Sequence, residues 1–178
     1  VGVRFKVMEW GQFHTAADTA SALMQQLHVD AAVQPALLHC YGDEIMDKWG
    51  TENGDDLLPL RELVQHELTV AGGTDTWPPN CFLGLRFAVE RRTRTGRLVA
   101  PHQALHRQEA LRLYTTAGAC LRGDPFQLGS IRVGTEADIV ITGTDPLEAP
   151  IEALDKPDVL ATFLSGELVY GGQALDLA

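Results

Sequence analysis

Strand patterns alternate with helix patterns along the first two thirds of the chain, and this order constrains the fold more than any other feature. The predicted strands are 3–8, 29–35 and 68–75, and the predicted helices are 15–27, 60–68, 82–93 and 107–121. Such alternation requires right-handed crossovers and gives a parallel sheet. Three strands are too few to bury both faces of that sheet alone. Since each strand–helix unit takes roughly 30 residues, the order fits a (β/α)8 barrel, or TIM barrel, that lacks its first half.

The segment 36–56 interrupts this alternation. Gly, Asp and Asn are scattered through it, and Pro35 stops the strand before it. We therefore predict a long irregular connection, of the kind that is usually functional or mobile.

The predicted helices carry apolar residues at helical spacing. The residues expected to face inward are Ala16, Ala20, Leu23 and Leu27, then Leu60, Leu63, Val64 and Leu68, then Phe82, Leu85 and Val89, and finally Ala110, Tyr114, Ala117 and Leu121.

After Gly123 the pattern changes from α/β to β. The stretch "IRVGTEADIVITG" contains a glycine turn followed by an apolar strand. The stretch "VLATFLSGELVYGG" is typical of two strands joined at "SGE" as a hairpin. The chain is therefore predicted to have two parts, an α/β part over residues 1–122 and a β part over residues 123–178.

Charge and hydropathy narrow the possible partners. The formal net charge is −10 over 178 residues, whereas nucleic acid and anionic membranes attract chains with an excess of Lys and Arg. The simplest meaning of the charge is solubility. No apolar run reaches the roughly 18 residues of a membrane-spanning helix, and no secretory signal is present. We expect a small-molecule substrate and neither a nucleic-acid nor a membrane partner.

The cysteines and the first residue bear on the origin of the chain. Cys40, Cys81 and Cys120 are far apart and form no CxxC pair, so neither a zinc knuckle nor a disulfide framework is indicated. Free thiols fit a reducing compartment, and we expect a cytoplasmic protein. The chain starts at Val1, inside a strand pattern and without Met, which predicts a fragment or a processed chain.

Asp75 is the strongest candidate for a catalytic residue. It lies where the predicted strand "LTVAGGTD" ends, and the carboxyl ends of strands form the active sites of α/β folds. Gly72 and Gly73 allow a ligand or backbone to come close. A carboxylate there can take a proton from a metal-bound water and pass it to a leaving amine. The alternative is that Asp75 caps the turn before Pro78 and Pro79.

Four further residues could line a substrate pocket. Glu9 and Trp10 follow the first strand and are expected at the same rim, although they could equally be a solvated acid and a packing indole. His39 is expected in the long loop after the second strand, the one histidine of the six that is placed to reach the site, and the favoured alternative is a surface histidine. Trp77 could form a wall of the pocket or simply pack.

Several segments together resemble the C-terminal half of a metal-dependent amidohydrolase. They are "LPLRELV" with "LTVAGGTDTWPPN", "QEALRLYTTAGAC", "LGSIRVGTEADIVITGTDPL" and "VLATFLSGELVYGG". The closest branch is the YtcJ-like amidohydrolase family 3, whose last barrel strand ends in a motif similar to Gly73-Thr74-Asp75. The opening "VMEWGQF" and "AAVQP" resemble the ends of the sixth and seventh strands of that family.

The resemblance implies the fold and the chemistry. The fold would be α/β, with about the last three strands of a TIM barrel over 1–122 and C-terminal strands of a small β-sandwich over 123–178. The full-length parent would be an enzyme that uses one or two divalent metals, usually zinc, to hydrolyse non-peptide C–N bonds. Asp75 would then activate the water, protonate the leaving group and, in some members, ligate the metal.

Departures from the family pattern open an alternative. The sixth-strand metal-binding histidine of the family falls at Trp10, and an indole N–H can only donate. His14 is a weak substitute because it lies four residues later in a turn. The family's earlier ligands precede Val1, and catalytic zinc normally needs three protein ligands. We therefore expect no stable metal in this chain alone. The alternative is a non-catalytic, amidohydrolase-like binding protein.

A half barrel would leave unpaired strand edges, so we also expect a homo-oligomer or aggregation.

Overall fold

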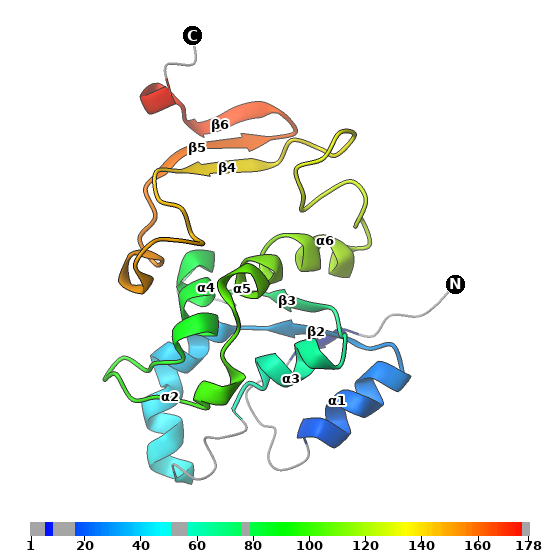
Figure 1. Cartoon of the computed structure of the whole chain (residues 1–178), viewed down its shortest axis with the longest axis vertical. Coiled ribbons are helices and arrows are strands. Elements are labelled where there is room, and N and C mark those ends of the chain that lie inside the picture. The colour runs from blue at the N-terminus through cyan, green and yellow to red at the C-terminus, as the bar shows by residue number, and fades with distance from the viewer. Residues whose placement is uncertain (1–5, 9–16, 51–56, 76–78, 176–178) are drawn as a thin grey trace.

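The chain forms two separate sheets, and a computed structural model describes residues 6–8, 17–50, 57–75 and 79–175 (Figure 1). The first sheet has the strand order β1-β2-β3 and the second has the order β4-β5-β6. Helices surround the first sheet, whereas the second lies at the opposite end of the molecule beyond α6 (Figure 1). Among the described residues, no helix is long and apolar enough to cross a membrane. The cytoplasmic location stays a prediction.

The first sheet is parallel, as the alternation of elements predicts. Its strands are β1 (Lys6–Met8), β2 (Asp30–Val33) and β3 (Val70–Gly72). Met8 pairs with Ala32 on one side of β2, and Val33 pairs with Gly72 on the other. All three strands point the same way, so their carboxyl ends meet at one edge of the sheet.

The helices of the first part include the four predicted ones in order, but a helix over 35–49 and a short 3-10 helix are additional, and the last predicted helix is divided in two. They are α1 (Ala17–Gln26), α2 (Pro35–Trp49), α3 (Leu60–Gln65), α4 (Cys81–Glu90), α5 (Arg107–Leu113) and α6 (Thr116–Arg122), with a short 3-10 helix η2 (Pro101–Gln103) before α5.

Helix α2 occupies a segment that we predicted to be irregular, and that prediction is wrong. Pro35 stands in the first turn of the helix, where its missing N–H costs nothing because that donor would be unpaired anyway. The buried positions Leu38, Gly42 and Met46 follow helical spacing. Gly42 hides the pattern because it lacks a side chain, and the structure explains the gap: a Cβ there would lie 2.8 Å from the Thr93 methyl.

One predicted helix face and the extent of another predicted helix also need correction. On α1, Ser21 and Met24 are buried, whereas Leu23 and the residue directly after the helix, Leu27, are exposed. The Ser21 hydroxyl donates to Glu62 on α3, which turns that face of α1 inward. The single helix predicted over 107–121 is divided at Tyr114 and Thr115. The Thr115 hydroxyl donates to the Leu111 carbonyl at 3.0 Å, a local bond that competes with continuation of the helix.

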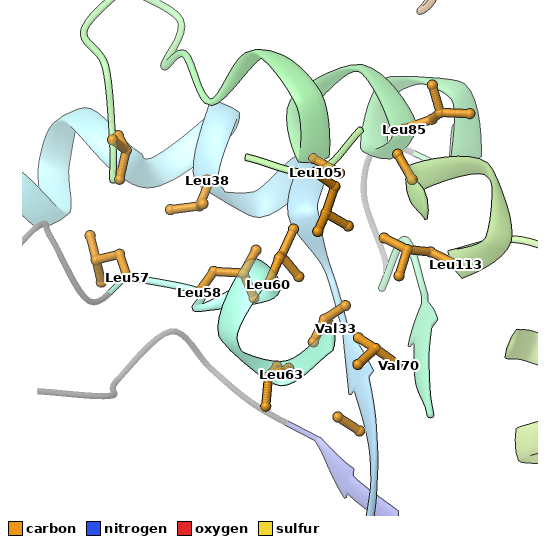
Figure 2. Packing of buried hydrophobic residues seen from close by; sticks show 14 of the residues in the cluster. Val33, Leu38, Leu57, Leu58, Leu60, Leu63, Val70, Leu85, Leu105 and Leu113 are labelled. Carbon is orange, nitrogen blue, oxygen red and sulfur yellow. The ribbon is translucent and has the colours of Figure 1, made fainter. Parts of the chain in front are cut away.

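The hydrophobic core lies between the parallel sheet and its helices (Figure 2). Val33 and Val70 project from neighbouring strands toward Leu60 and Leu63 of the α3 region (Figure 2). Leu85 and Leu113 continue the cluster on α4 and α5. Leu154, from the C-terminal part, belongs to the same cluster.

The second sheet is an antiparallel meander. Its strands are β4 (Ile139–Thr142), β5 (Val159–Leu164) and β6 (Glu167–Gly171). Ser165 and Gly166 connect β5 to β6, and both have positive φ, as two-residue hairpin turns prefer. The predicted hairpin at "SGE" is therefore confirmed. Every residue of β6 is exposed.

Noncovalent contacts, as well as the continuous chain, connect the two predicted parts. The short helix η3 (Ile151–Ala153) and the residues beside it pack on α4 and α5. Asp155 accepts a hydrogen bond from the Arg86 guanidinium at 2.9 Å, and Arg107 donates to the Ala149 carbonyl. The described sheets fall in the parts predicted as 1–122 and 123–178, but residues 145–155 pack with the first part. The division into two domains stays a prediction.

Candidate active site

The candidate site lies at the carboxyl edge of the parallel sheet. At this edge β2 ends at Val33 and is followed by Gln34, and β3 ends at Gly72 and is followed by Gly73. The Gly73 amide donates to the Val33 carbonyl at 2.7 Å, which ties the chain after β3 to the end of β2. Backbone hydrogen bonds therefore fix the position of the chain at this edge as far as Gly73.

Asp75 lies directly beyond this anchored point. Its side chain is exposed, and its backbone has φ 54°, in the left-handed region that few residues other than glycine adopt. The Thr74 hydroxyl donates to the Asp75 carbonyl at 3.4 Å. The structure thus places Asp75 at the strand end, as predicted, with its carboxylate open to solvent. Its catalytic role stays a prediction.

Gln34 is a neighbour of the site that was not predicted from the sequence. A Cβ at Gly73 would lie 3.5 Å from the side-chain amide of Gln34, so that amide lies beside the backbone just before Asp75. The sequence does carry a signal for it, since Gln34 directly follows a strand and a polar residue there reaches the same edge. Pro35 obscures this signal because it indicates only where the strand ends.

Tyr114 fills the space between the end of β3 and the start of α4. A Cβ at Gly72 would lie 2.5 Å from the ring carbon Cζ, and a Cβ at Gly84 would overlap the phenolic oxygen. That hydroxyl is buried without a hydrogen-bond partner among the described residues. Burial, with a smaller contribution from Cys81, raises the pKa of Tyr114.

Asn80 closes the other end of the segment that carries Asp75. Its side-chain oxygen accepts from the amides of Phe82 and Leu83, which caps the N-terminus of α4. Its side-chain nitrogen donates to the Asp155 carbonyl at 2.9 Å. One side chain therefore starts α4 and also attaches the C-terminal part to it.

The structure does not place the predicted pocket residues at the edge that carries Asp75. His39 lies on α2 rather than in a loop, because α2 occupies that part of the predicted connection. Its ring stacks on Phe87 at a centroid distance of 4.0 Å, and its Nδ1 lies 3.2 Å from the Arg92 carbonyl. These are packing contacts against α4. Glu9, Trp10 and Trp77 lie outside the described residues, as does His14, so the pocket roles stay predictions.

The described side chains do not make a metal site. No group of three or more His, Cys, Asp or Glu side chains comes together in the part of the chain that the structure describes. Among the residues with described positions, Asp75 is the one carboxylate within a few residues of a carboxyl strand end in the parallel sheet. A single carboxylate does not satisfy zinc, which takes three protein ligands in catalytic sites.

A separate cavity of about 390 Å³ opens at the start of α5. Its lining comes from α5 and the turn that contacts it: His106, Arg107, Gln108, Glu109, Arg112, Leu147 and Glu148. None of these residues follows a strand of the parallel sheet, and none was predicted as a site residue. The cavity is therefore distinct from the edge that carries Asp75.

Comparison with known proteins agrees with this geometry. The amidohydrolase family model matches residues 7–170. An N-substituted formamide deformylase from Arthrobacter pascens is 30% identical over 153 residues, which are 83% of this chain and 28% of that protein. The YtcJ protein of Bacillus subtilis strain 168, named as a putative amidohydrolase, is 25% identical over 71% of this chain and 25% of its own length. The chain thus spans less than a third of these relatives.

A solved structure shares the fold. The structure of an uncharacterised metal-dependent hydrolase from Pyrococcus horikoshii OT3 superimposes with a TM-score of 0.70 at 21% identity, covering 83% of this chain and 30% of that one. The parallel sheet with its helices, the exposed aspartate at a strand end and the match over 7–170 lead to one conclusion: the chain belongs to the amidohydrolase family.

Proposed function

We propose that this chain is the C-terminal part of a metal-dependent hydrolase that cleaves non-peptide C–N bonds, with Asp75 as its acid–base residue. The observation that carries the proposal is the exposed carboxylate of Asp75 at the carboxyl end of β3. In parallel α/β folds, catalytic groups gather at this end of the strands. The family match over most of the chain supports the same reaction class.

The step assigned to Asp75 is a proton transfer. Its carboxylate accepts a proton from the water that attacks the carbon of the C–N bond. It then gives this proton to the nitrogen as the bond breaks, so that an amide yields an acid and an amine. General acid–base catalysis of this kind contributes about 10²–10⁴-fold to the rate. The exposure of Asp75 leaves it accessible to a substrate from solvent.

The proposal extends to the architecture. We assign β1, β2 and β3 to the last three strands of a TIM barrel, and β4, β5 and β6 to a small β-sandwich. The neighbour order β1-β2-β3 supports the barrel, because sequential strands of a barrel pair in sequence order. The exposed apolar side chains of Leu23 on α1 and of Leu27 directly after it also suit a helix that has a further neighbour in a complete ring.

A divalent metal, zinc in our proposal, would supply the Lewis acidity of the parent enzyme. The described residues offer Asp75 alone as a ligand at this edge, so the other ligands would come from the rest of a longer protein. We expect this chain by itself to hold no metal stably.

The test uses the longer parent protein. Asp75→Asn is expected to lower kcat about 10²–10⁴-fold, with N-substituted formamides as the first substrates because a 30% identical relative is named for them. Asp47→Asn is the matched control, since the Asp47 side chain is 69% exposed on α2. Metal content is measured on the same samples.

The outcome separates this proposal from the alternative. Stoichiometric metal with loss of turnover in Asp75→Asn supports the hydrolase. A parent protein without metal and without turnover supports the non-catalytic binding protein, in which Trp10 replaces a metal-binding histidine. Turnover that survives Asp75→Asn would refute the role of Asp75.

We also propose that the 178-residue chain self-associates. Its second sheet exposes the apolar side chains of Leu164, Leu168 and Tyr170, and exposed apolar strands at a sheet edge favour association. Sedimentation velocity over a range of concentrations should show species larger than a monomer. A single monomeric species throughout would contradict both the self-association and the half-barrel assignment.

A further inference from the structure

We propose that Tyr114 is a positioning residue for Asp75: its side chain, held between Gly72 and Gly84, fixes the backbone at the end of β3 and in the first turns of α4. This inference rests on the proposed function of Asp75. It concerns a residue that directly follows α5 and does not itself reach a substrate.

Two glycines stand on either side of the segment that carries Asp75. Gly72 is the last residue of β3, and Gly84 is in the first turns of α4. The Tyr114 ring lies against the backbone at Gly72, and its phenolic oxygen lies against the backbone at Gly84. The side chain therefore sets the distance from the strand end to the start of the helix.

Space, rather than backbone conformation, requires glycine at these two positions. Neither Gly72 nor Gly84 is among the glycines with positive φ, so other residues could adopt their backbone conformations. A Cβ at either position would collide with the Tyr114 side chain, at 2.5 Å from Cζ in the case of Gly72. The two glycines and the tyrosine are therefore one packing unit.

Tyr114 also has a defined place in its own segment. It directly follows Leu113, the last residue of α5, and precedes α6, which begins at Thr116. Both helices lie beside β3 (Figure 1). The break between α5 and α6, where the Thr115 hydroxyl donates to the Leu111 carbonyl, lies next to Tyr114. At this position the Tyr114 ring points toward the end of β3.

The hydroxyl of Tyr114 does not explain this placement. It is buried and has no hydrogen-bond partner among the described residues. Burial also keeps it protonated, because it raises the pKa of Tyr114. The bulk of the side chain, with the ring against Gly72 and the phenolic oxygen against Gly84, holds the two glycines at their separation, and a hydrogen bond of the hydroxyl does not.

The first experiment measures amide hydrogen exchange in this chain. The Gly73 amide donates to the Val33 carbonyl, so its exchange rate reports on the strand end before Asp75. Tyr114→Leu is expected to speed exchange at Gly73 while the Leu105 amide, which donates to the Ala88 carbonyl, keeps its rate. Tyr41→Leu, a change of an exposed tyrosine on α2, is the matched control. Unchanged exchange at Gly73 in Tyr114→Leu would overturn the proposal.

The second experiment measures kinetics in the longer parent. A displacement of about 1 Å at a reacting group can cost about 10²-fold in rate, so Tyr114→Leu should lower kcat by up to that factor with little change in KM. Tyr114→Phe, which keeps the ring, should recover most of the loss. An equal loss in Tyr114→Phe would overturn the proposal, since the hydroxyl would then be the essential group.

A third measurement keeps the test valid if Tyr114→Leu does not fold. Gly84→Ala should lower the melting temperature less in a Tyr114→Phe background than in the wild type, because the overlapping oxygen has been removed. Equal losses in the two backgrounds would contradict the contact. Should the parent show no hydrolase activity, the proposed function fails, whereas exchange at Gly73 and this coupling still decide the contact of Tyr114.

Discussion

The two sheets of this molecule have similarly apolar strands and bury them very differently. In β2 of the parallel sheet, Val33 is fully buried, whereas in β6 of the antiparallel sheet Tyr170 is 61% exposed. Helices cover the first sheet, and the second projects beyond them (Figure 1). The difference shows that an apolar strand pattern identifies residues that can be buried, while the layers around a sheet decide which ones are.

The second sheet is apolar on both of its faces. Neighbouring residues of a strand point to opposite faces, and both Ile139 and Val140 of β4 are apolar. Ile139 pairs with Phe163 and Val140 pairs with Thr162 on β5. Strands that are apolar on both faces are typical of sheets covered on both sides. In the described part of the chain, Ala161 is the one residue of these three strands that is buried.

The largest expected effect comes from the core of the first part. Leu63 is 1% exposed and packs in the main cluster, so Leu63→Ala should lower the free energy of unfolding by about 2–5 kcal/mol through lost burial and the cavity left behind. Leu168→Ala in β6 is the matched change, and at 46% exposure it should cost within about 0.5 kcal/mol.

Urea unfolding of the two variants beside the wild type measures this difference. Self-association must be held constant, so the three proteins are compared at one concentration and at the same oligomeric state. Equal losses in Leu63→Ala and Leu168→Ala would mean that the antiparallel sheet is as well packed as the core. The comparison between the two regions would then fail.

A smaller effect is expected at the joint between the regions. Asn80→Asp keeps a side-chain oxygen that can cap α4 but loses the N–H donor to the Asp155 carbonyl. Loss of this bond should cost about 0.5–1.5 kcal/mol. Asn80→Ala removes the cap as well and should cost about 1 kcal/mol more. Chemical unfolding measures both, and wild-type stability in Asn80→Asp would show that this bond does not help to hold the regions together.

The smallest expected effect concerns pH and lies within the first part. Asp43 on α2 accepts hydrogen bonds from the Thr95 and Thr93 hydroxyls, and these bonds, with Arg97 nearby, lower the pKa of Asp43 from its usual 3.8. Because the folded pKa lies below the unfolded one, this stabilisation is fully present above about pH 3.8. It is lost as the pH falls through the lowered value.

Acid unfolding tests this assignment. Asp43→Asn should reduce stability near neutral pH and should flatten the decline in stability below about pH 4. Asp124→Asn, at an aspartate after α6 whose 43% exposed side chain pairs with Arg122, serves as the control and should leave the acid transition nearly unchanged. An acid transition of unchanged slope in Asp43→Asn would show that the network around Asp43 does not contribute to it.

Part of the candidate site was predictable, and part was not. The position of Asp75 followed from the strand pattern before it, because a carboxylate after a buried parallel strand reaches a known edge of the sheet. Gln34 lies beside Gly73 only because two parallel strands pair, and Tyr114 reaches Gly72 only because α5 ends where it does. Neither contact leaves a periodic signal in the sequence.

The sequence by itself determined the order of elements, the parallel sheet, the hairpin at Ser165 and the family resemblance. These depend on local periodicity and turn chemistry, which act over a few residues. Tertiary structure alone decided that 35–49 forms a helix and that α1 buries Ser21 rather than Leu23. The physical reason is the same in both cases. Gly42 and Ser21 are buried by specific neighbours, Thr93 and Glu62, and contacts between residues distant in the chain have no local pattern.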